Sequence, residues 1–166
     1  MEFKISGHEV SLRDRVIKGS SKDKAQLIQF MNLMYQELFP DQKDFNHLNI
    51  TVEQYFSTET PLWWIESEHN LSPTPHLILP IAGLWMGNAI DQINGGRYAH
   101  IFLLYVIPEY RRQGIAKLLL QQAESWAKIR GDQQIGLQVF PQNQAAVNLY
   151  QNMGFQIQSL TMLKSL

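Results

Sequence analysis

Hydrophobic and polar positions change their spacing along the chain, and each change predicts a new element. Residues 9–18 alternate between the two kinds, as a strand with one covered face does. Over residues 23–38 the apolar positions recur every three or four residues, which predicts an amphipathic helix. Thr51, with Gln54 three residues later, has the form of a capping box, so a second, short helix is predicted over residues 51–56.

The middle of the chain reads as three antiparallel strands. They are predicted at residues 61–68, 77–90 and 99–106. Asn94-Gly95-Gly96 gives a strong hairpin signal between the last two, and Pro80 or Gly83 is expected to mark a bulge or an edge. The third strand is almost wholly apolar, which predicts a central position with both faces covered. Four large side chains of this region are expected in the core: Trp63, Trp64, Trp85 and Met86.

The last part of the chain alternates helices with strands. A helix is predicted from Gly114 to Arg130, and Gly131 supplies its C-terminal stop. After it come a strand at 135–140, a helix at 143–153 ended by Gly154, and a final strand at 155–164. The whole order describes a mixed α/β (α+β) fold with one central sheet. No proline- or glycine-rich linker divides it, so residues 1–166 are expected to form a single domain.

Composition narrows the class of protein. Of the 166 residues, 45% are hydrophobic and 17% charged, as in a globular protein, and the formal net charge of -1 argues against broad binding to nucleic acid. The chain contains no cysteine, which excludes disulfides, cysteine-based zinc sites and a cysteinyl acyl-enzyme. Its five histidines show no metal-binding spacing, so no metal is expected. Neither a signal peptide nor a membrane span is visible, and a cytoplasmic location is expected.

One stretch combines a strand end, two arginines and a helix start. In the run "YVIPEYRRQGIAKLLL", Arg111 and Arg112 come directly before Gly114, where the third predicted helix begins. A helix start has unpaired N–H groups and a partial positive charge, which suit an anion such as a phosphate. The patterns GxxxxGK[ST] and GxGxxG are both absent, so a nucleotide triphosphate or dinucleotide site has no support. Solvated arginines at an ordinary helix start explain the hexapeptide alone equally well.

Two motifs in order give this stretch a wider context. The first runs from Leu104 through "VIPEY" to Arg111-x-x-Gly114-x-Ala116 and an amphipathic helix. The second, further along the chain, contains Asn143, Ala146, Leu149, Tyr150, Gly154 and Phe155. Together they resemble the core motifs of the GNAT superfamily, the acyl-CoA-dependent N-acetyltransferases. The resemblance covers about residues 76–158, and Ala116 stands where many members have glycine.

The resemblance implies a fold and a cofactor site. It implies a mixed, strongly twisted sheet, antiparallel in its first half, with parallel strands four and five splayed apart and helices on both faces. Acetyl-CoA would lie in that opening, where the backbones of Leu104 and Val106 would meet its acetyl and pantetheine parts. Its pyrophosphate would be held by the backbone N–H groups of Arg112, Gln113, Gly114, Ile115, Ala116 and Lys117, with charge added by Arg111. Asn143 is expected to cap its helix and, by resemblance, to contact cofactor or substrate.

Two side chains are the catalytic candidates. Tyr150 would donate a proton or a hydrogen bond to the departing thiolate, although a packing role for this tyrosine stays open. His100 is the best base near the start of the fourth strand and has the same strand parity as Leu104, but it could equally be an edge histidine. Glu66 and Glu68 are further candidate bases.

The amine substrate is less defined by the sequence. The segment 37–56 is acidic and aromatic, which would suit a cationic amine, and a solvated loop explains it equally well; its acidic residues are Glu37, Asp41, Asp44 and Glu53. The leading hypothesis is an N-acetyltransferase that moves an acetyl group from acetyl-CoA to a small-molecule or peptide amine by direct attack. The alternative is a non-catalytic, acyl-CoA-binding sensor of the same fold. The resemblance also allows a homodimer, and neither nucleic acid nor membrane is expected as a partner.

Overall fold

The computed structural model describes residues 15–71 and 78–166. The strands are β1 (Arg15–Lys18), β2 (Leu62–Leu71), β3 (Ile78–Ile90), β4 (Arg97–Val106) and β5 (Ile135–Leu137). The helices are α1 (Lys24–Leu38), α2 (His47–Tyr55), α3 (Ile115–Arg130) and α4 (Gln144–Asn152), with short 3-10 turns η1 (Ser21–Asp23) and η2 (Pro108–Tyr110).

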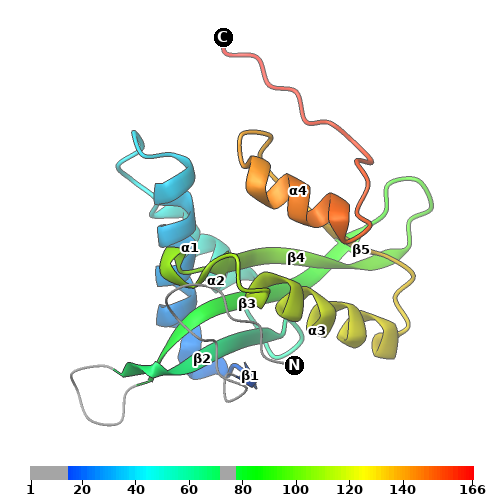
Figure 1. Ribbon diagram of the computed structural model, residues 1–166. Helices are drawn as coiled ribbons and strands as arrows, with labels where there is room; N and C mark the ends of the chain where they lie inside the picture. Colours follow the sequence, from blue (N-terminus) through cyan, green and yellow to red (C-terminus); the bar gives the residue numbers. More distant parts are fainter. Residues whose placement is uncertain (1–14, 72–77) are drawn as a thin grey trace.

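The strands form one five-stranded sheet in the order β1-β2-β3-β4-β5. Neighbours from β1 to β4 are antiparallel, and β4 and β5 are parallel. The predicted mixed fold, with an antiparallel first half and helices on both faces, is therefore confirmed (Figure 1). No helix in the described ranges is both long enough and apolar enough to cross a membrane.

Apolar side chains form one cluster on each face of the sheet. On one face, α1 and α2 contribute residues such as Leu27 and Val52, which pack with Trp64 and Trp85. On the other face, α3 contributes residues such as Leu119, which pack with Trp63 and Met86. The predicted burial of all three tryptophans and the methionine is confirmed. The two clusters place β3 and β4 at the centre of the fold, as the apolar sequence of β4 predicts.

The hairpin and the irregularity at Pro80 are also confirmed. Asp91 N–H donates to Gly96 O (2.8 Å), and Gly95 has φ +73°, a conformation that glycine adopts readily. In the β2–β3 pair, Ile65 lies opposite Ala82 while Glu66 lies opposite Pro80, so the register shifts beside the proline. Proline has no N–H to donate to a neighbouring strand, which makes this a favourable place for a break in the ladder.

A second register shift, in β4, was not predicted. Trp85 lies opposite Leu103 and Met86 opposite Ile101, which leaves Phe102 as an extra residue. Gly87 makes room for it, since a Cβ there would lie 1.9 Å from the Phe102 ring. The bulge reverses the alternation of side chains along β4. Ile101 contributes to the cluster on the α3 face, and two positions later Leu103 belongs to the cluster on the α1/α2 face.

Some predicted elements differ from the structure, most clearly in three places. Helix α2 begins at His47, and the Thr51 hydroxyl donates to the His47 carbonyl (3.2 Å) inside the helix instead of capping it. Strand β5 ends at Leu137. The predicted strand at 155–164 is absent: the last residues of the chain extend away from the body (Figure 1), with Leu160 81% exposed. Alternation favours a strand only where a partner edge is within reach, which explains this error. The predicted strand residues 9–14 lie outside the described ranges.

Candidate active site

The parallel strands β4 and β5 pair only over a short length. Their register runs from Ala99 opposite Ile135 to Ile101 opposite Leu137, whereas β4 continues to Val106. Beyond Ile101, no described strand pairs with that edge of β4. The predicted separation of the fourth and fifth strands is therefore present.

Backbone groups of β4 point into this opening. The N–H of Ile107 donates to Ile81 O (2.9 Å), toward β3. Because N–H groups alternate along an antiparallel strand, those of Val106 and Leu104 point the other way, toward the side that β5 leaves open. The two residues predicted to meet the acetyl and pantetheine parts thus lie beside the opening.

The start of α3 presents a row of backbone N–H groups. Gly114 caps the helix with φ +82°, and Arg112 has φ +62°, the one positive φ among the described non-glycine residues. Alternation of right- and left-handed residues turns successive N–H groups toward one point, a shape that binds anions. Within the described ranges, no hydrogen-bond acceptor takes the N–H groups from Arg112 to Lys117, and a Cβ at Gly114 would meet nothing within 4 Å. Open space and free donors fit a pyrophosphate.

The Arg111 side chain has hydrogen-bond partners within the protein. Its Nη1 and Nη2 donate to Glu37 Oε1 (2.5 Å) and Oε2 (2.7 Å), and its Nε donates to Val106 O (2.9 Å). The guanidinium is therefore engaged by the protein itself, whereas the Arg112 and Lys117 side chains are exposed. The sequence reasoning missed Glu37 in this role because the two residues are 74 positions apart.

Helix α4 carries the second motif. Asn143 is its N-cap, and the side-chain oxygen accepts from Ala146 N–H (3.4 Å), so the predicted capping role is confirmed. Leu149 and Tyr150 pack partly buried against the cluster on the α3 face. Leu104 packs against the same cluster, so Tyr150 and Leu104 share a face of the sheet.

Burial changes the acidity of Tyr150. Desolvation raises the pKa of its phenol to about 12, so the group is protonated at neutral pH. Its ring lies 5.6 Å from that of Phe155, between centroids. A protonated phenol can donate a hydrogen bond, but a thiol has a pKa near 8.5, so complete proton transfer from Tyr150 to a thiolate would be unfavourable. This environment suits hydrogen-bond donation.

His100 lies on the other face from the one predicted. His100 and Leu104 are an even number of residues apart, which in a regular strand would place them on the same face. The extra residue Phe102 lies between them, so they lie on opposite faces. Its ring lies 5.2 Å from Phe102, which packs against the α1/α2 cluster. Burial lowers the pKa of the imidazole, and Nδ1 is buried with no hydrogen-bond partner among the described residues. His100 is therefore neutral at pH 7 and able to accept a proton.

The acidic residues of segment 37–56 are mostly engaged. Glu37 pairs with Arg111, Glu53 pairs with Lys24 (2.6 Å), and Asp44 Oδ1 accepts from Asn46 N–H (2.8 Å). Of the further candidate bases Glu66 and Glu68, only the Glu66 side chain lies in the part of the chain that the structure describes, and a role for either stays a prediction.

An aromatic cluster near Glu37 was only partly foreseen. Tyr35 lies 6.1 Å from the rings of both Phe39 and Phe45, which belong to the predicted aromatic segment. Phe140, from the loop between β5 and α4, lies 4.9 Å from Phe39, between centroids. The loop before α4 is thus in contact with the end of α1, a pairing that no local sequence pattern indicates.

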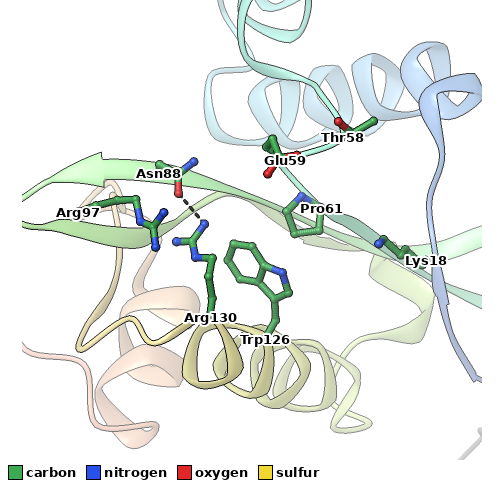
Figure 2. Close-up of a pocket in the computed structure, with 8 residues that line it drawn as sticks. All are labelled: Lys18, Thr58, Glu59, Pro61, Asn88, Arg97, Trp126 and Arg130. Atoms are coloured by element: carbon green, nitrogen blue, oxygen red, sulfur yellow. Dashed lines mark hydrogen bonds between the residues drawn. The ribbon is translucent and has the colours of Figure 1, made fainter.

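Figure 2 shows a shallow pocket at the other end of α3, about 24 Å along the helix from Gly114. Arg130 stacks on Trp126 (4.0 Å from Cζ to the ring centroid) and donates to Asn88 Oδ1 (2.6 Å) and Asp132 Oδ2 (2.5 Å). These contacts join the end of α3 to β3, so the Arg130 and Trp126 side chains that line the pocket have a structural role. No group of three His, Asp or Glu side chains in the described ranges could hold a metal ion.

The sequence of this chain is similar to those of known acetyltransferases. The sequence profile of the "Acetyltransferase (GNAT) family" matches residues 25–155. The chain is 31% identical over 99 residues to acetyltransferase SG1711 of Sodalis glossinidius, a match that covers 60% of this chain and 69% of that protein. It is 32% identical over 82 residues to the uncharacterized N-acetyltransferase YdgE of Bacillus subtilis, covering 49% of this chain and only 52% of that relative.

Solved structures share the fold. A putative acetyl transferase from Pyrococcus furiosus superposes with a TM-score of 0.74 at 21% identity, covering 93% of this chain and all (100%) of that one. The aminoglycoside N-acetyltransferase AAC(6')-Iy, in complex with CoA, superposes with a TM-score of 0.67 at 14% identity, covering 92% of this chain and 94% of that one. With the family profile matching well over half of its residues, the chain belongs to the GNAT acetyltransferase family.

Proposed function

We propose that the chain is an N-acetyltransferase that moves an acetyl group from acetyl-CoA to a primary amine by direct attack in a ternary complex. The observation that carries the proposal is the row of backbone N–H groups from Arg112 to Lys117, which no acceptor among the described residues takes and which lies next to the open edge of β4. A direct attack agrees with the sequence, since no cysteine is present to form an acyl-enzyme. We further propose that residues 1–166 work as one domain.

Backbone groups would hold most of the cofactor. The amides from Arg112 to Lys117 would bind the pyrophosphate, helped by the positive end of α3. The N–H groups of Leu104 and Val106 point into the opening and would position the pantetheine and the acetyl carbonyl. Asn143 would contribute chiefly by fixing the start of α4.

Acetyl-CoA supplies the activated acetyl thioester. The Leu104 N–H would polarise its carbonyl, and the Tyr150 hydroxyl would stabilise the charge that develops on sulfur. Tyr150 is suited to this task because its raised pKa keeps the hydroxyl proton in place. The proton that finally neutralises the thiolate would come from the amine or from water.

A proton must also leave the attacking amine. A lysine-like amine has a pKa near 10.4, so only about one molecule in 10³ is neutral at pH 7. His100 would accept this proton, directly or through water, because burial keeps it neutral. Its position on the α1/α2 face would bring the amine to the thioester from the side opposite α3 and α4. The separation of β4 and β5 would connect the two faces.

The substrate class follows from the α1/α2 face. Phe140 is exposed and its ring contacts that of Phe39, and the exposed residues Asp41 and Asp44 follow Phe39 in the same segment. A cationic small-molecule amine would suit such a surface. Several structural neighbours are aminoglycoside acetyltransferases, so polyamines, aminoglycosides and peptide amines belong in the first panel of acceptors.

The test is thiol release from acetyl-CoA across that panel of amines. We expect release to be strongly enhanced by one amine class and absent without enzyme. Release from no amine, together with no thermal stabilisation by acetyl-CoA, would contradict the proposal.

The alternative function is an acyl-CoA-binding sensor. It is favoured by one observation: neither His100 Nδ1 nor the Tyr150 hydroxyl has a hydrogen-bond partner that prepares it for proton transfer among the described residues. A sensor would be stabilised by acetyl-CoA but would release no thiol with any amine, so the same assay separates the two functions.

A further inference from the structure

Arg111 is held by two elements at once, α1 and β4. All three of its guanidinium nitrogens are engaged, two by the Glu37 carboxylate of α1 and Nε by the last carbonyl of β4, that of Val106. A bidentate arginine–carboxylate pair is geometrically the most demanding kind of ion pair, and each of its hydrogen bonds is charge-assisted. The arginine is therefore fixed in orientation although its side chain is 37% exposed.

Tyr105 completes the arrangement. Its hydroxyl donates to Glu37 Oε2 (3.2 Å), and the Arg111 guanidinium carbon lies 5.4 Å from the centroid of its ring. Tyr105 itself is buried in the α1/α2 cluster. We call Arg111, Glu37 and Tyr105 the arginine clasp, and residues 112–117, proposed to bind the pyrophosphate, the pyrophosphate loop. The clasp joins the last turn of α1 to the end of β4 and to the start of this loop.

The residue next to the clasp is in a strained conformation. Arg112 has φ +62°, which costs a residue other than glycine about 1–2 kcal/mol. Its own side chain is exposed and contributes no packing that could hold the backbone. Strain of this kind persists only where the surroundings fix it. On the N-terminal side the fixed neighbour is Arg111, and on the C-terminal side it is the buried Ile115.

We propose that Glu37 is a positioning residue that holds the pyrophosphate loop in its anion-binding shape by clamping Arg111. This inference rests on the proposed function. Arg111 then binds no phosphate, and its charge is used inside the protein. Because Glu37 stands at the end of α1, beside the aromatic cluster of Tyr35 and Phe39, the clasp links the amine side of the site to the cofactor side.

A rival role makes the opposite prediction. In this rival role Arg111 is a phosphate ligand, and Glu37 competes with the phosphate for its guanidinium. Removing the Glu37 charge would then free the guanidinium and strengthen acetyl-CoA binding. Simple electrostatics points the same way, since the loss of a negative charge favours an anionic ligand. A positioning role alone predicts weaker binding.

The experiment compares Glu37→Gln with Glu124→Gln. Both variants lose one negative charge and one ion pair, but Glu124 pairs with Lys128 (3.9 Å) on α3 and touches no part of the clasp. Acetyl-CoA affinity is measured by calorimetry, and the order parameters of the backbone N–H groups of residues 112–117 are measured by NMR relaxation without added acetyl-CoA. For Glu37→Gln we expect about tenfold weaker binding and a fall of these order parameters from about 0.85, the value of a rigid backbone, to below about 0.6. Glu124→Gln is expected to change neither.

Further readouts separate positioning from stability and chemistry. In Glu37→Gln, KM for acetyl-CoA is expected to rise while kcat at saturation stays within about twofold. Arg111→Lys, which cannot form the bidentate pair, is expected to match it, and the double variant to be no worse than either single one. Unchanged or tighter binding by Glu37→Gln would overturn the inference, as would unchanged order parameters of the loop amides.

Failure of the proposed function looks different. A wild-type protein that binds no acetyl-CoA would contradict the proposed function. The comparison of order parameters between Glu37→Gln and Glu124→Gln would still decide whether the clasp holds the loop.

Discussion

Helices α3 and α4 both pack on the same face of the sheet, but they are held very differently. Helix α3 has five buried residues: Ile115, Leu119, Leu120, Ala123 and Ala127. Helix α4 has none, and is held by partly buried contacts of residues such as Leu149 and Tyr150. Local opening is easiest where few apolar groups are buried. The pyrophosphate loop is therefore attached to the most firmly packed helix, and the proposed catalytic tyrosine to the least firmly packed one.

This difference suits the two proposed tasks. Anion binding by backbone N–H groups needs a loop that is already in shape, since ordering it on binding would weaken affinity. Tyr150 must approach a sulfur atom that arrives with the cofactor, and a loosely held helix can adjust to it. The comparison makes predictions about each helix, and these can be tested separately.

The largest expected effect is at the start of α3. Gly114→Glu should abolish measurable acetyl-CoA binding, because a side chain at φ +82° distorts the loop and places a carboxylate beside the proposed pyrophosphate site. Gly131→Glu is a matched control at the other end of α3, with φ +87° and equally open space around a Cβ. Both variants should lose about 1–2 kcal/mol of stability, and only Gly114→Glu should lose binding in calorimetry. Equal binding by the two would remove the pyrophosphate assignment.

The packing difference itself predicts unequal stabilities. Leu119→Ala, at a fully buried position of α3, should lower the free energy of unfolding by about 2–5 kcal/mol. Leu149→Ala, at a partly buried position of α4, should lower it by about 1–2 kcal/mol. Urea denaturation measures both, and similar losses would mean that α4 is held as firmly as α3.

The chemistry assigned to α4 predicts an effect on turnover alone. Tyr150→Phe should reduce kcat about 10²- to 10³-fold, as the loss of a hydrogen-bond donor to developing charge does. Affinity for acetyl-CoA should stay nearly unchanged, because the ring and its packing remain. Tyr55→Phe, which removes a hydroxyl from an exposed tyrosine of α2, is the control in the same steady-state assay. A full-rate Tyr150→Phe enzyme would reduce Tyr150 to a packing residue.

The smallest expected effect concerns His100 and pH. Burial lowers its pKa, so the imidazole stays neutral below pH 6.5 and the enzyme's acidic limb in kcat/KM should lie below that value. Folding should also lose stability as the pH falls from 6.5 toward the lowered pKa, because the unfolded chain then binds the proton more readily. His100→Gln should remove both effects. The pH profile of kcat/KM is measured with two amines of different pKa, and an acidic limb at the same pH with both belongs to the enzyme. If that limb is unchanged in His100→Gln, His100 is not the base.

The sequence allowed the sheet, the helix at 115–130 and the cap at Asn143 to be predicted, because each depends on local order. Gly131 stops α3 where a left-handed residue is needed, and Asn143 accepts a hydrogen bond from its own helix. The prediction failed at 155–164, where alternation favoured a strand that has no partner edge.

The sequence by itself therefore determined the periodicity of the helices and strands, the residues that start and stop helices, and the types of residue at the start of α3. All of these depend on neighbours a few positions apart. The tertiary structure alone decided two features of the site. The extra residue Phe102 turned His100 to the α1/α2 face, and the fold brought Glu37 to Arg111 across 74 positions. Both depend on how strands and helices meet in space, and no spacing along the chain encodes a contact between elements that far apart.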